Sequence, residues 1–207
     1  MEEKAYMEKY SSEEDETLLW IEKQTHIRTS YPHMLCGKTE GKFLEMISRM
    51  ISPSAILEIG TFTGYSAICL ARGLAPGGTM ETLEINDEIT DIIREGFEKA
   101  GLSGCINIIQ GDAKDTIPTL KNKYDLIFID ANKREYSAYY DMVFPLLNSG
   151  GYIIADNVLW NGKVSGAVSS DAQTRGIALF NKKVREDPRT DNVILPIRDG
   201  INIIRKK

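Results

Sequence analysis

Short apolar runs alternate with longer amphipathic stretches along this chain, and the alternation limits its fold more than any other feature. The runs are rich in Ile, Leu and Val and nearly continuous, which is typical of strands buried on both faces. The expected strands cover residues 55–60, 79–85, 106–111, 124–130, 151–156 and 192–197. The expected helices cover residues 63–74, 87–100, 112–119, 133–147 and 171–187. Strand–helix alternation predicts an α/β fold with a mostly parallel sheet and helices on both faces.

The two ends of the chain depart from this alternation. The last apolar segment, residues 201–207, follows the preceding strand after a short turn, so we expect an antiparallel last strand. Near the N-terminus the pattern predicts helices over residues 11–26 and 38–51, the first of them with acidic residues in its first turn. We expect a single domain, 1–207, made of an N-terminal helical extension (1–52) and a cofactor-binding α/β core (53–207).

Composition excludes several classes of protein. The net charge of -5 argues against a broad electrostatic grip on nucleic acid. Three cysteines without CxxC spacing argue against a disulfide framework or a zinc site and fit a reducing compartment. Two histidines leave little basis for a Ser-His-Asp hydrolase. Because no secretory signal or membrane-length apolar run is visible, we expect a cytoplasmic protein without membrane contact.

A glycine-containing turn follows the first expected strand, in the segment LEIGTFTGYSA. Gly60 and Gly64 at a strand-to-helix turn let the backbone approach a ligand closely. Their G-x-x-x-G spacing differs from the G-x-G-x-x-G of pyrophosphate-binding enzymes, which disfavours an NAD oxidoreductase. Glu84, at the end of the second strand, can accept hydrogen bonds from both hydroxyls of a ribose. Asp112 and Ala113 close the third strand, where they suit an adenine ring, although Asp112 alone would more often be a helix N-cap.

Oxygen-bearing side chains close the next two strands. Asp130 and Lys133 follow the fourth strand, and Asp156 and Asn157 follow the fifth. Two carboxylates and an amide oxygen suit a hard cation, Mg²⁺ first and Mn²⁺ or Ca²⁺ as alternatives. Each acid by itself could equally be an ordinary cap. A nearby dication would disfavour the ammonium form of Lys133 and so help this side chain to act as a base.

Several stretches resemble one known family. They are LEIGTFTGYSA, TLEIN, GDA, YDLIFIDANKREY, LLNSGGYIIADNVLWNGKV and LPIRDGINIIRKK, spread over about 34–207. The chain resembles class I S-adenosylmethionine-dependent O-methyltransferases of the cation-dependent group, which includes catechol and caffeoyl-CoA O-methyltransferases. The resemblance implies a Rossmann-like, seven-stranded methyltransferase sheet, S-adenosyl-L-methionine as cofactor, a divalent cation and a homodimer.

The resemblance also implies roles for individual residues. Lys133 is the implied general base, with Asp130 beside it, and Trp160 borders the substrate. The implied metal ligands are Asp130, Asp156 and Asn157. The implied cofactor-binding residues are Met34, Glu58, Gly60, Phe62, Ser66, Glu84, Asp112, Ala113 and Asp130. Met34 and Trp160 could equally be ordinary apolar packing residues.

The acceptor is left open by the sequence. We expect metal-dependent transfer of a methyl group to a hydroxyl of a small, catechol- or caffeoyl-like aromatic acceptor. Phe62 stands where animal catechol enzymes carry tyrosine, so their substrate is not transferred to this chain. One alternative is a tRNA wobble 5-hydroxyuridine O-methyltransferase; another is a non-catalytic cofactor-binding scaffold. The tRNA alternative requires a basic pocket mouth, for which the candidates are Lys38, Lys42, Arg49, Lys133, Arg134 and Lys163.

Overall fold

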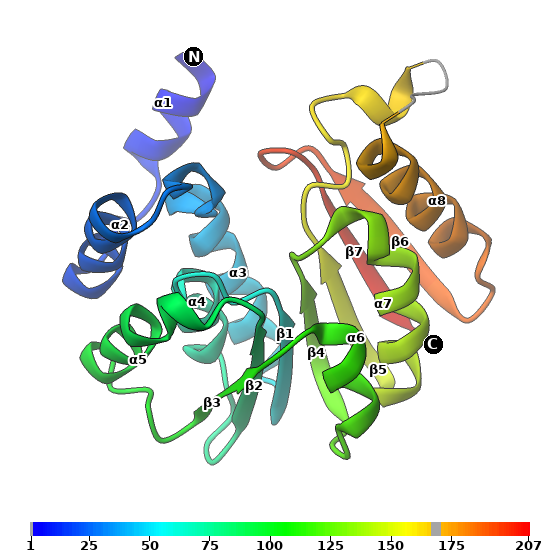
Figure 1. Cartoon of the computed structure of the whole chain (residues 1–207). Helices are drawn as coiled ribbons and strands as arrows, with labels where there is room; N and C mark the ends of the chain where they lie inside the picture. The colour runs from blue at the N-terminus through cyan, green and yellow to red at the C-terminus, as the bar shows by residue number, and fades with distance from the viewer. Residues whose placement is uncertain (1, 167–170) are drawn as a thin grey trace.

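One twisted sheet organises the protein in a computed structural model, which describes residues 2–166 and 171–207 (Figure 1). In this part of the chain the sheet has seven strands in the order β3-β2-β1-β4-β5-β7-β6. The strands are β1 (Ala55–Ile59), β2 (Thr79–Glu84), β3 (Ile106–Gln110), β4 (Tyr124–Ile129), β5 (Leu147–Ala155), β6 (Thr190–Leu195) and β7 (Ile201–Lys206). Strands β1 to β5 pair in parallel, while β7 is antiparallel to both of its neighbours. The predicted fold class is confirmed.

The helices of the core follow the expected stretches but are shorter. They are α4 (Tyr65–Ala71), α5 (Thr90–Lys99), α6 (Ala113–Thr116), α7 (Tyr136–Val143) and α8 (Ala172–Glu186). Short 3-10 helices flank them: η2 (Asp87–Ile89), η3 (Ile117–Thr119), η4 (Lys133–Glu135), η5 (Phe144–Leu146) and η6 (Lys163–Ser165). The expected helix over 133–147 therefore ends earlier, and β5 begins at Leu147 rather than at residue 151. The polar segment that precedes Gly151 resembles a turn in sequence, although β4 pairs with β5 from Leu147 onward.

The N-terminal extension contains α1 (Glu2–Tyr10), α2 (Glu16–Arg28), η1 (Pro32–Met34) and α3 (Gly37–Ile51). The predicted helix over 11–26 is placed wrongly at its start, and α1 was not expected. Helix α2 begins at Glu16 because the carboxylate of Asp15 accepts hydrogen bonds from the backbone N–H groups of Thr17 and Leu18, each at 3.0 Å. Helix α1 projects beyond α2 and α3 (Figure 1).

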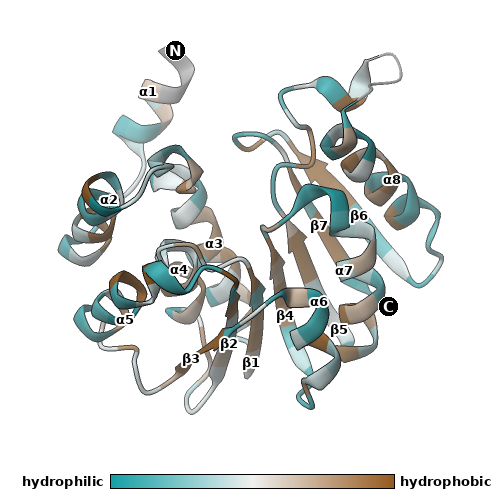
Figure 2. Cartoon of the chain, viewed as in Figure 1, coloured by the Kyte–Doolittle hydropathy of each residue, from teal (hydrophilic) through white to brown (hydrophobic). Residues whose placement is uncertain are grey.

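Apolar side chains fill both faces of the sheet. Along β4, Leu126 and Phe128 belong to the cluster beneath α2 to α5, whereas Ile127 and Ile129 belong to the cluster beneath α6 to α8. This alternation follows from the two-residue period of a strand. Figure 2 shows mostly hydrophobic residues along the central strands β4 and β5, with hydrophilic residues on the outer helices. Burying each such side chain contributes about 1.5–3 kcal/mol to folding.

Backbone hydrogen bonds continue past the ends of the central strands and align the residues that follow them. The N–H of Gly60 donates to the Leu83 carbonyl at 3.0 Å, and the N–H of Asp130 donates to Ile59 at 2.9 Å. The N–H of Asp156 donates to Ile129 at 3.0 Å. The residues predicted at the ends of β1, β4 and β5 are thus fixed in register along one edge of the sheet. No helix among the described residues is long and apolar enough to cross a membrane.

Candidate active site

A cavity of about 1050 Å³ lies at this edge of the sheet. Eleven of the thirteen predicted site residues line it: Met34, Gly60, Phe62, Ser66, Glu84, Asp112, Ala113, Asp130, Lys133, Asn157 and Trp160. The other two, Glu58 and Asp156, are 0% and 1% exposed and lie behind the wall. The fold therefore brings most of the predicted site residues to one cavity.

The glycine turn between β1 and α4 gives the cavity its floor. Gly60 has φ +98° and Gly64 has φ +88°, conformations that favour glycine. Gly64 is also the N-cap residue of α4. Phe62, between them, has φ +48° although it carries a side chain. Positive φ values at non-glycine residues cluster at ligand sites, because the surrounding structure must maintain them.

Beneath this turn Glu58 is the centre of a buried hydrogen-bond network. Ser66 Oγ donates to Glu58 Oε1 at 2.6 Å, and Thr82 Oγ1 donates to Glu58 Oε2 at 2.5 Å. Burial raises the pKa of Glu58 to about 8, although these two hydrogen bonds oppose the rise. Glu58 supports Ser66, whose position at the cavity wall it fixes.

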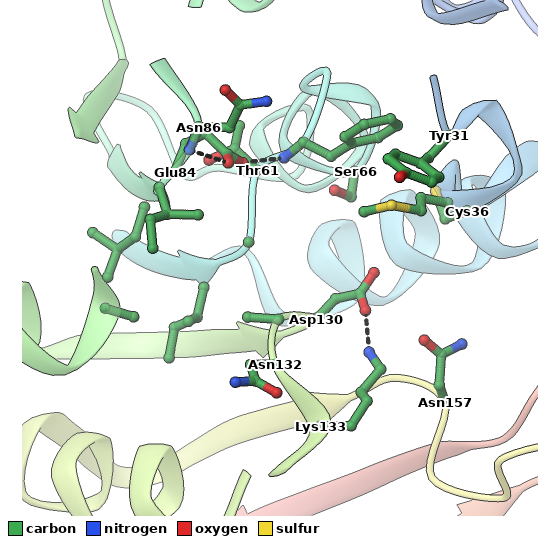
Figure 3. Close-up of a pocket in the computed structure, with 18 of the residues that line it drawn as sticks. Tyr31, Cys36, Thr61, Ser66, Glu84, Asn86, Asp130, Asn132, Lys133 and Asn157 are labelled. Carbon is green, nitrogen blue, oxygen red and sulfur yellow. Dashed lines mark hydrogen bonds and ion pairs between the residues drawn. The ribbon is translucent and has the colours of Figure 1, made fainter. Parts of the chain in front are cut away.

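Glu84 presents a carboxylate at the end of β2. The backbone N–H of Phe62 donates to Glu84 Oε2 at 2.7 Å, and that of Asn86 donates to Oε1 at 2.8 Å (Figure 3). Burial raises the pKa of Glu84, and the backbone hydrogen bonds act against that rise. Each carboxylate oxygen keeps further acceptor capacity, so the group can still bind a diol.

Asp112 has two roles at the end of β3. Its carboxylate accepts a hydrogen bond from the N–H of Lys114 at 2.8 Å, so Asp112 is the N-cap residue of α6, the role that is common for an aspartate at this position. Asp112 also lines the cavity together with Ala113. The cap fixes the carboxylate but leaves acceptor capacity toward the cavity.

Lys133 and Asp130 form an ion pair in the wall of the cavity. Lys133 Nζ donates to Asp130 Oδ1 at 2.5 Å and to the hydroxyl of Tyr136 at 2.7 Å. Figure 3 shows Asp130, Lys133 and Asn157 directed into the same part of the cavity. Lys133 is only 6% exposed, so its amine is held in a single orientation.

Asp156 is buried beside this pair without a hydrogen-bond partner for either carboxylate oxygen. Burial raises its pKa to about 9, and the neighbouring carboxylates of Asp130 and Glu40 add to the rise. An unpaired buried carboxylate is costly, which makes Asp156 well suited to bind a cation. No three His, Cys, Asp or Glu side chains form a ready-made metal cluster within residues 2–166 and 171–207. The oxygens that could hold a hard cation here are those of Asp130, Asp156 and the amide of Asn157.

The segment after β5 contains three non-glycine residues with positive φ values. Asn157, Trp160 and Asn161 have φ values of +56°, +49° and +52°. Trp160 Nε1 donates to Asp171 Oδ2 at 3.3 Å, which fixes the indole between the cavity and α8. Trp160 is thus both a wall of the cavity and a packing residue.

Sequence reasoning missed several residues of the cavity. Tyr31, Asn132 and Arg198 line it. Asn132 lies within the FIDANK stretch and was open to detection as another strand-end polar residue. Tyr31 and Arg198 come from outside the central alternation, and no local pattern assigns them to this edge.

The basic mouth that the tRNA alternative requires is formed only in part by its candidate residues. Of its six candidates only Lys133 lines the cavity. Lys38 pairs with Glu13 at 2.8 Å, and Lys42 and Arg49 both pair with Glu45. Carboxylates therefore offset the charge of these three side chains.

The strand order, the glycine turn and the acid at the end of β2 together define a class I methyltransferase that uses S-adenosyl-L-methionine. The chain belongs to the O-methyltransferase family, whose sequence model matches residues 8–207. It is a SAM-dependent O-methyltransferase.

Named relatives agree with this membership. Catechol O-methyltransferase of Niastella koreensis is 33% identical over 168 residues, which are 79% of this chain and 76% of the relative. Caffeoyl-CoA O-methyltransferase 2 of Eucalyptus globulus is 35% identical over 187 residues, 84% of this chain and 75% of the relative. The crystal structure of the O-methyltransferase from Bacillus cereus in complex with SAH superposes with a TM-score of 0.91 at 31% identity, covering 98% of this chain and 96% of that one.

Proposed function

We propose that this O-methyltransferase requires a divalent cation and methylates a hydroxyl of a small catechol- or caffeoyl-like aromatic acceptor. The observation that carries the proposal is Asp156, a buried carboxylate with two unpartnered oxygens next to the Lys133–Asp130 pair. The names of the catechol and caffeoyl-CoA relatives support the acceptor class.

The cofactor fits the part of the cavity between the glycine turn and β3. When bound, S-adenosyl-L-methionine supplies a methyl group on a sulfonium. Glu84 would accept hydrogen bonds from the ribose, and Asp112 and Ala113 would face the adenine. The residues on the methionine side would be Met34, Gly60, Phe62, Ser66 and Asp130. Glu58 acts from behind the wall, through Ser66.

The cation fits the oxygens of Asp130, Asp156 and Asn157, and hard-ion chemistry favours Mg²⁺, with Mn²⁺ or Ca²⁺ as alternatives. When bound, such an ion lowers the pKa of a coordinated hydroxyl by several units. The three residues lie at or next to strand ends held by backbone hydrogen bonds, so their oxygens are preorganised.

Lys133 is the proposed general base: in its neutral amine form, which a cation bound nearby would favour, Nζ would receive the proton of the acceptor hydroxyl. Asp130 and Tyr136 hold that nitrogen, at 2.5 and 2.7 Å, and so fix the direction of proton transfer. The carboxylate of Asp130 also compensates the positive charge that Lys133 gains. Trp160 would border the ring of the acceptor and exclude water from that side.

A small acceptor is favoured over tRNA because only one of the six candidate basic residues, Lys133, lines the cavity, and Lys38, Lys42 and Arg49 are paired with carboxylates. Purified protein should methylate vicinal diphenols in the presence of Mg²⁺ or Mn²⁺ and lose that activity in excess chelator. A tRNA that carries an unmethylated 5-hydroxyuridine at the wobble position is the comparison substrate in the same methyl-transfer assay. Full activity in chelator would remove the metal requirement, and preferential methylation of tRNA would reject the small acceptor.

We also expect a homodimer in the cytoplasm. Helices α1 and α2 expose large apolar side chains, namely Tyr6, Met7, Tyr10, Leu19 and Ile27, which a second copy could cover. The three free thiols, Cys36, Cys69 and Cys105, suit a reducing compartment. Analytical ultracentrifugation of the full chain and of Tyr6→Ser/Tyr10→Ser tests the dimer, since the variant should sediment as a monomer.

A further inference from the structure

Glu40 is a buried carboxylate that the N-terminal extension delivers to the edge of the sheet. It lies on α3 and is only 1% exposed. Its Oε2 accepts a hydrogen bond from Arg198 Nη1 at 3.1 Å, while its Oε1 is buried without a partner. Asp156, also 1% exposed and without a hydrogen-bond partner for either carboxylate oxygen, lies close to it. Two buried carboxyl groups therefore lie together next to the Lys133–Asp130 pair.

Arg198 connects this carboxylate to the opposite end of the chain. It lies in the turn between β6 and β7, with φ +52°, and lines the cavity. Besides the ion pair with Glu40, its Nη2 donates to the backbone carbonyl of His33 at 3.1 Å. A non-glycine residue in this backbone region is strained, so the surrounding contacts must maintain it. The Glu40–Arg198 pair thus fixes α3 and η1 against the turn that follows β6.

Two ion pairs account for part of this region. Lys133 pairs with Asp130, and Arg198 pairs with Glu40. The buried carboxyl group of Asp156 lies outside both pairs. A cation bound at this point would compensate the charge of its ionised form.

We propose that Glu40 is a positioning residue of the cation site, with Arg198 holding its orientation. The inference rests on the proposed metal dependence and adds a residue outside the Asp130, Asp156 and Asn157 set. Oε2 is occupied by Arg198, and the acids within the described ranges do not form a ready-made three-member cluster. Glu40 is therefore assigned outside the direct ligands: its Oε1 would accept a hydrogen bond from water on a bound cation, and its carboxyl group would orient Asp156. Outer ligands of this kind typically change metal affinity 10–100-fold.

The test measures Mn²⁺ binding by electron paramagnetic resonance and by calorimetry, without turnover. Glu40→Gln keeps the size of the side chain and should weaken Mn²⁺ binding 10–100-fold. Affinity for the demethylated cofactor, S-adenosylhomocysteine, should change less than twofold. The matched control is Glu45→Gln, which removes another mostly buried, cation-paired carboxylate of α3. This control should bind Mn²⁺ like the parent protein.

A double variant tests whether the loss of Mn²⁺ binding comes from Glu40 itself or from leaving Arg198 unpaired and misfolding the protein. Glu40→Gln/Arg198→Gln leaves neither partner of the ion pair unpaired and conserves net charge, so it should fold, and its Mn²⁺ binding should still be at least about fivefold weaker. Unchanged binding in Glu40→Gln, equal loss in Glu45→Gln, or full affinity in the double variant overturns the role of Glu40. Absence of Mn²⁺ binding in the parent protein overturns instead the proposed metal dependence.

Discussion

A Cβ atom at Gly60 would lie 2.1 Å from the backbone carbonyl oxygen of Asp130. The turn after β1 and the end of β4 are therefore in contact at a point where no side chain fits. Gly60 lines the part of the cavity that is proposed for the cofactor, and Asp130 forms the ion pair with Lys133. The contact between them therefore fixes the glycine turn relative to the Lys133–Asp130 pair.

Gly60→Ala should destabilise the protein and displace Asp130. We expect the free energy of unfolding to fall by about 2 kcal/mol or more, because positive φ and a steric clash act together. S-adenosylhomocysteine binding should weaken at least tenfold. Gly77→Ala is the control: its φ is +76° but a Cβ there meets nothing within 4 Å. Urea denaturation should give that control a loss of only about 1 kcal/mol; equal losses would refute the importance of the Asp130 contact.

Tyr136→Phe tests how Lys133 is held. The Tyr136 hydroxyl accepts from Lys133 Nζ and lies 3.0 Å from the Asp156 carbonyl oxygen, to which it can donate. Without it the amine keeps only Asp130, so we expect kcat to fall about tenfold while KM for the cofactor changes less than twofold. Tyr140→Phe removes a hydroxyl on the same helix that donates to Asp187, away from the cavity. In steady-state kinetics the Tyr140→Phe control should have the kcat and KM of the parent protein. A similar loss of kcat in both variants would indicate only damage to α7.

The central fold could be predicted because its rules are local. A strand buried on both faces is apolar throughout, and parallel strands end at a common edge, so residues such as Glu84 and Asp130 could be placed together from their order alone. The start of β5 was missed because Gly150 and Gly151 resemble a turn. Helix α1 was missed because it lacks a strong apolar stripe.

The rest of the site depends on packing between distant segments. Glu40 lies in an amphipathic helix, two residues after Lys38, where a glutamate is normally solvated. The residues next to it in the sequence do not indicate that Arg198 pairs with it and that it is buried. Tyr31 lines the cavity from the segment that joins α2 to η1, outside the alternation of strands and helices. The same limit applies to the basic candidates: Lys42 looked available in sequence, but its partner Glu45 is one turn away on the same helix.

Glu58→Gln should change how stability depends on pH. Burial raises the pKa of Glu58 to about 8, from an ordinary value of 4.5, so the folded protein binds this proton more tightly than the unfolded chain does. Stability from this group is therefore lost as the pH rises from about 4.5 to about 8. The glutamine variant should flatten that decline in urea titrations between pH 5 and 8. Glu81→Gln, on the neighbouring strand β2, should retain the parent slope; an unchanged slope in Glu58→Gln would contradict the assignment.

Asp156→Asn should separate the stability of the apoprotein from its affinity for metal. The substitution keeps the shape of the side chain but removes a buried ionisable group whose two oxygens have no hydrogen-bond partner, and with it the cost of burying or neutralising a carboxylate. We therefore expect the Tm of the metal-free variant at pH 7.5 to equal or exceed that of the parent protein.

The same variant should lose the rise in Tm that Mg²⁺ or Mn²⁺ gives the parent, and its metal-dependent turnover should fall more than about 100-fold, because a neutral amide is a poor ligand for these ions. Affinity for S-adenosylhomocysteine should stay within about threefold, since Asp156 lies behind the cavity wall. Differential scanning fluorimetry with and without Mn²⁺, together with calorimetry of the cofactor, gives each quantity separately. A lower metal-free Tm with an intact response to Mn²⁺ would mean that Asp156 supports the fold rather than the cation.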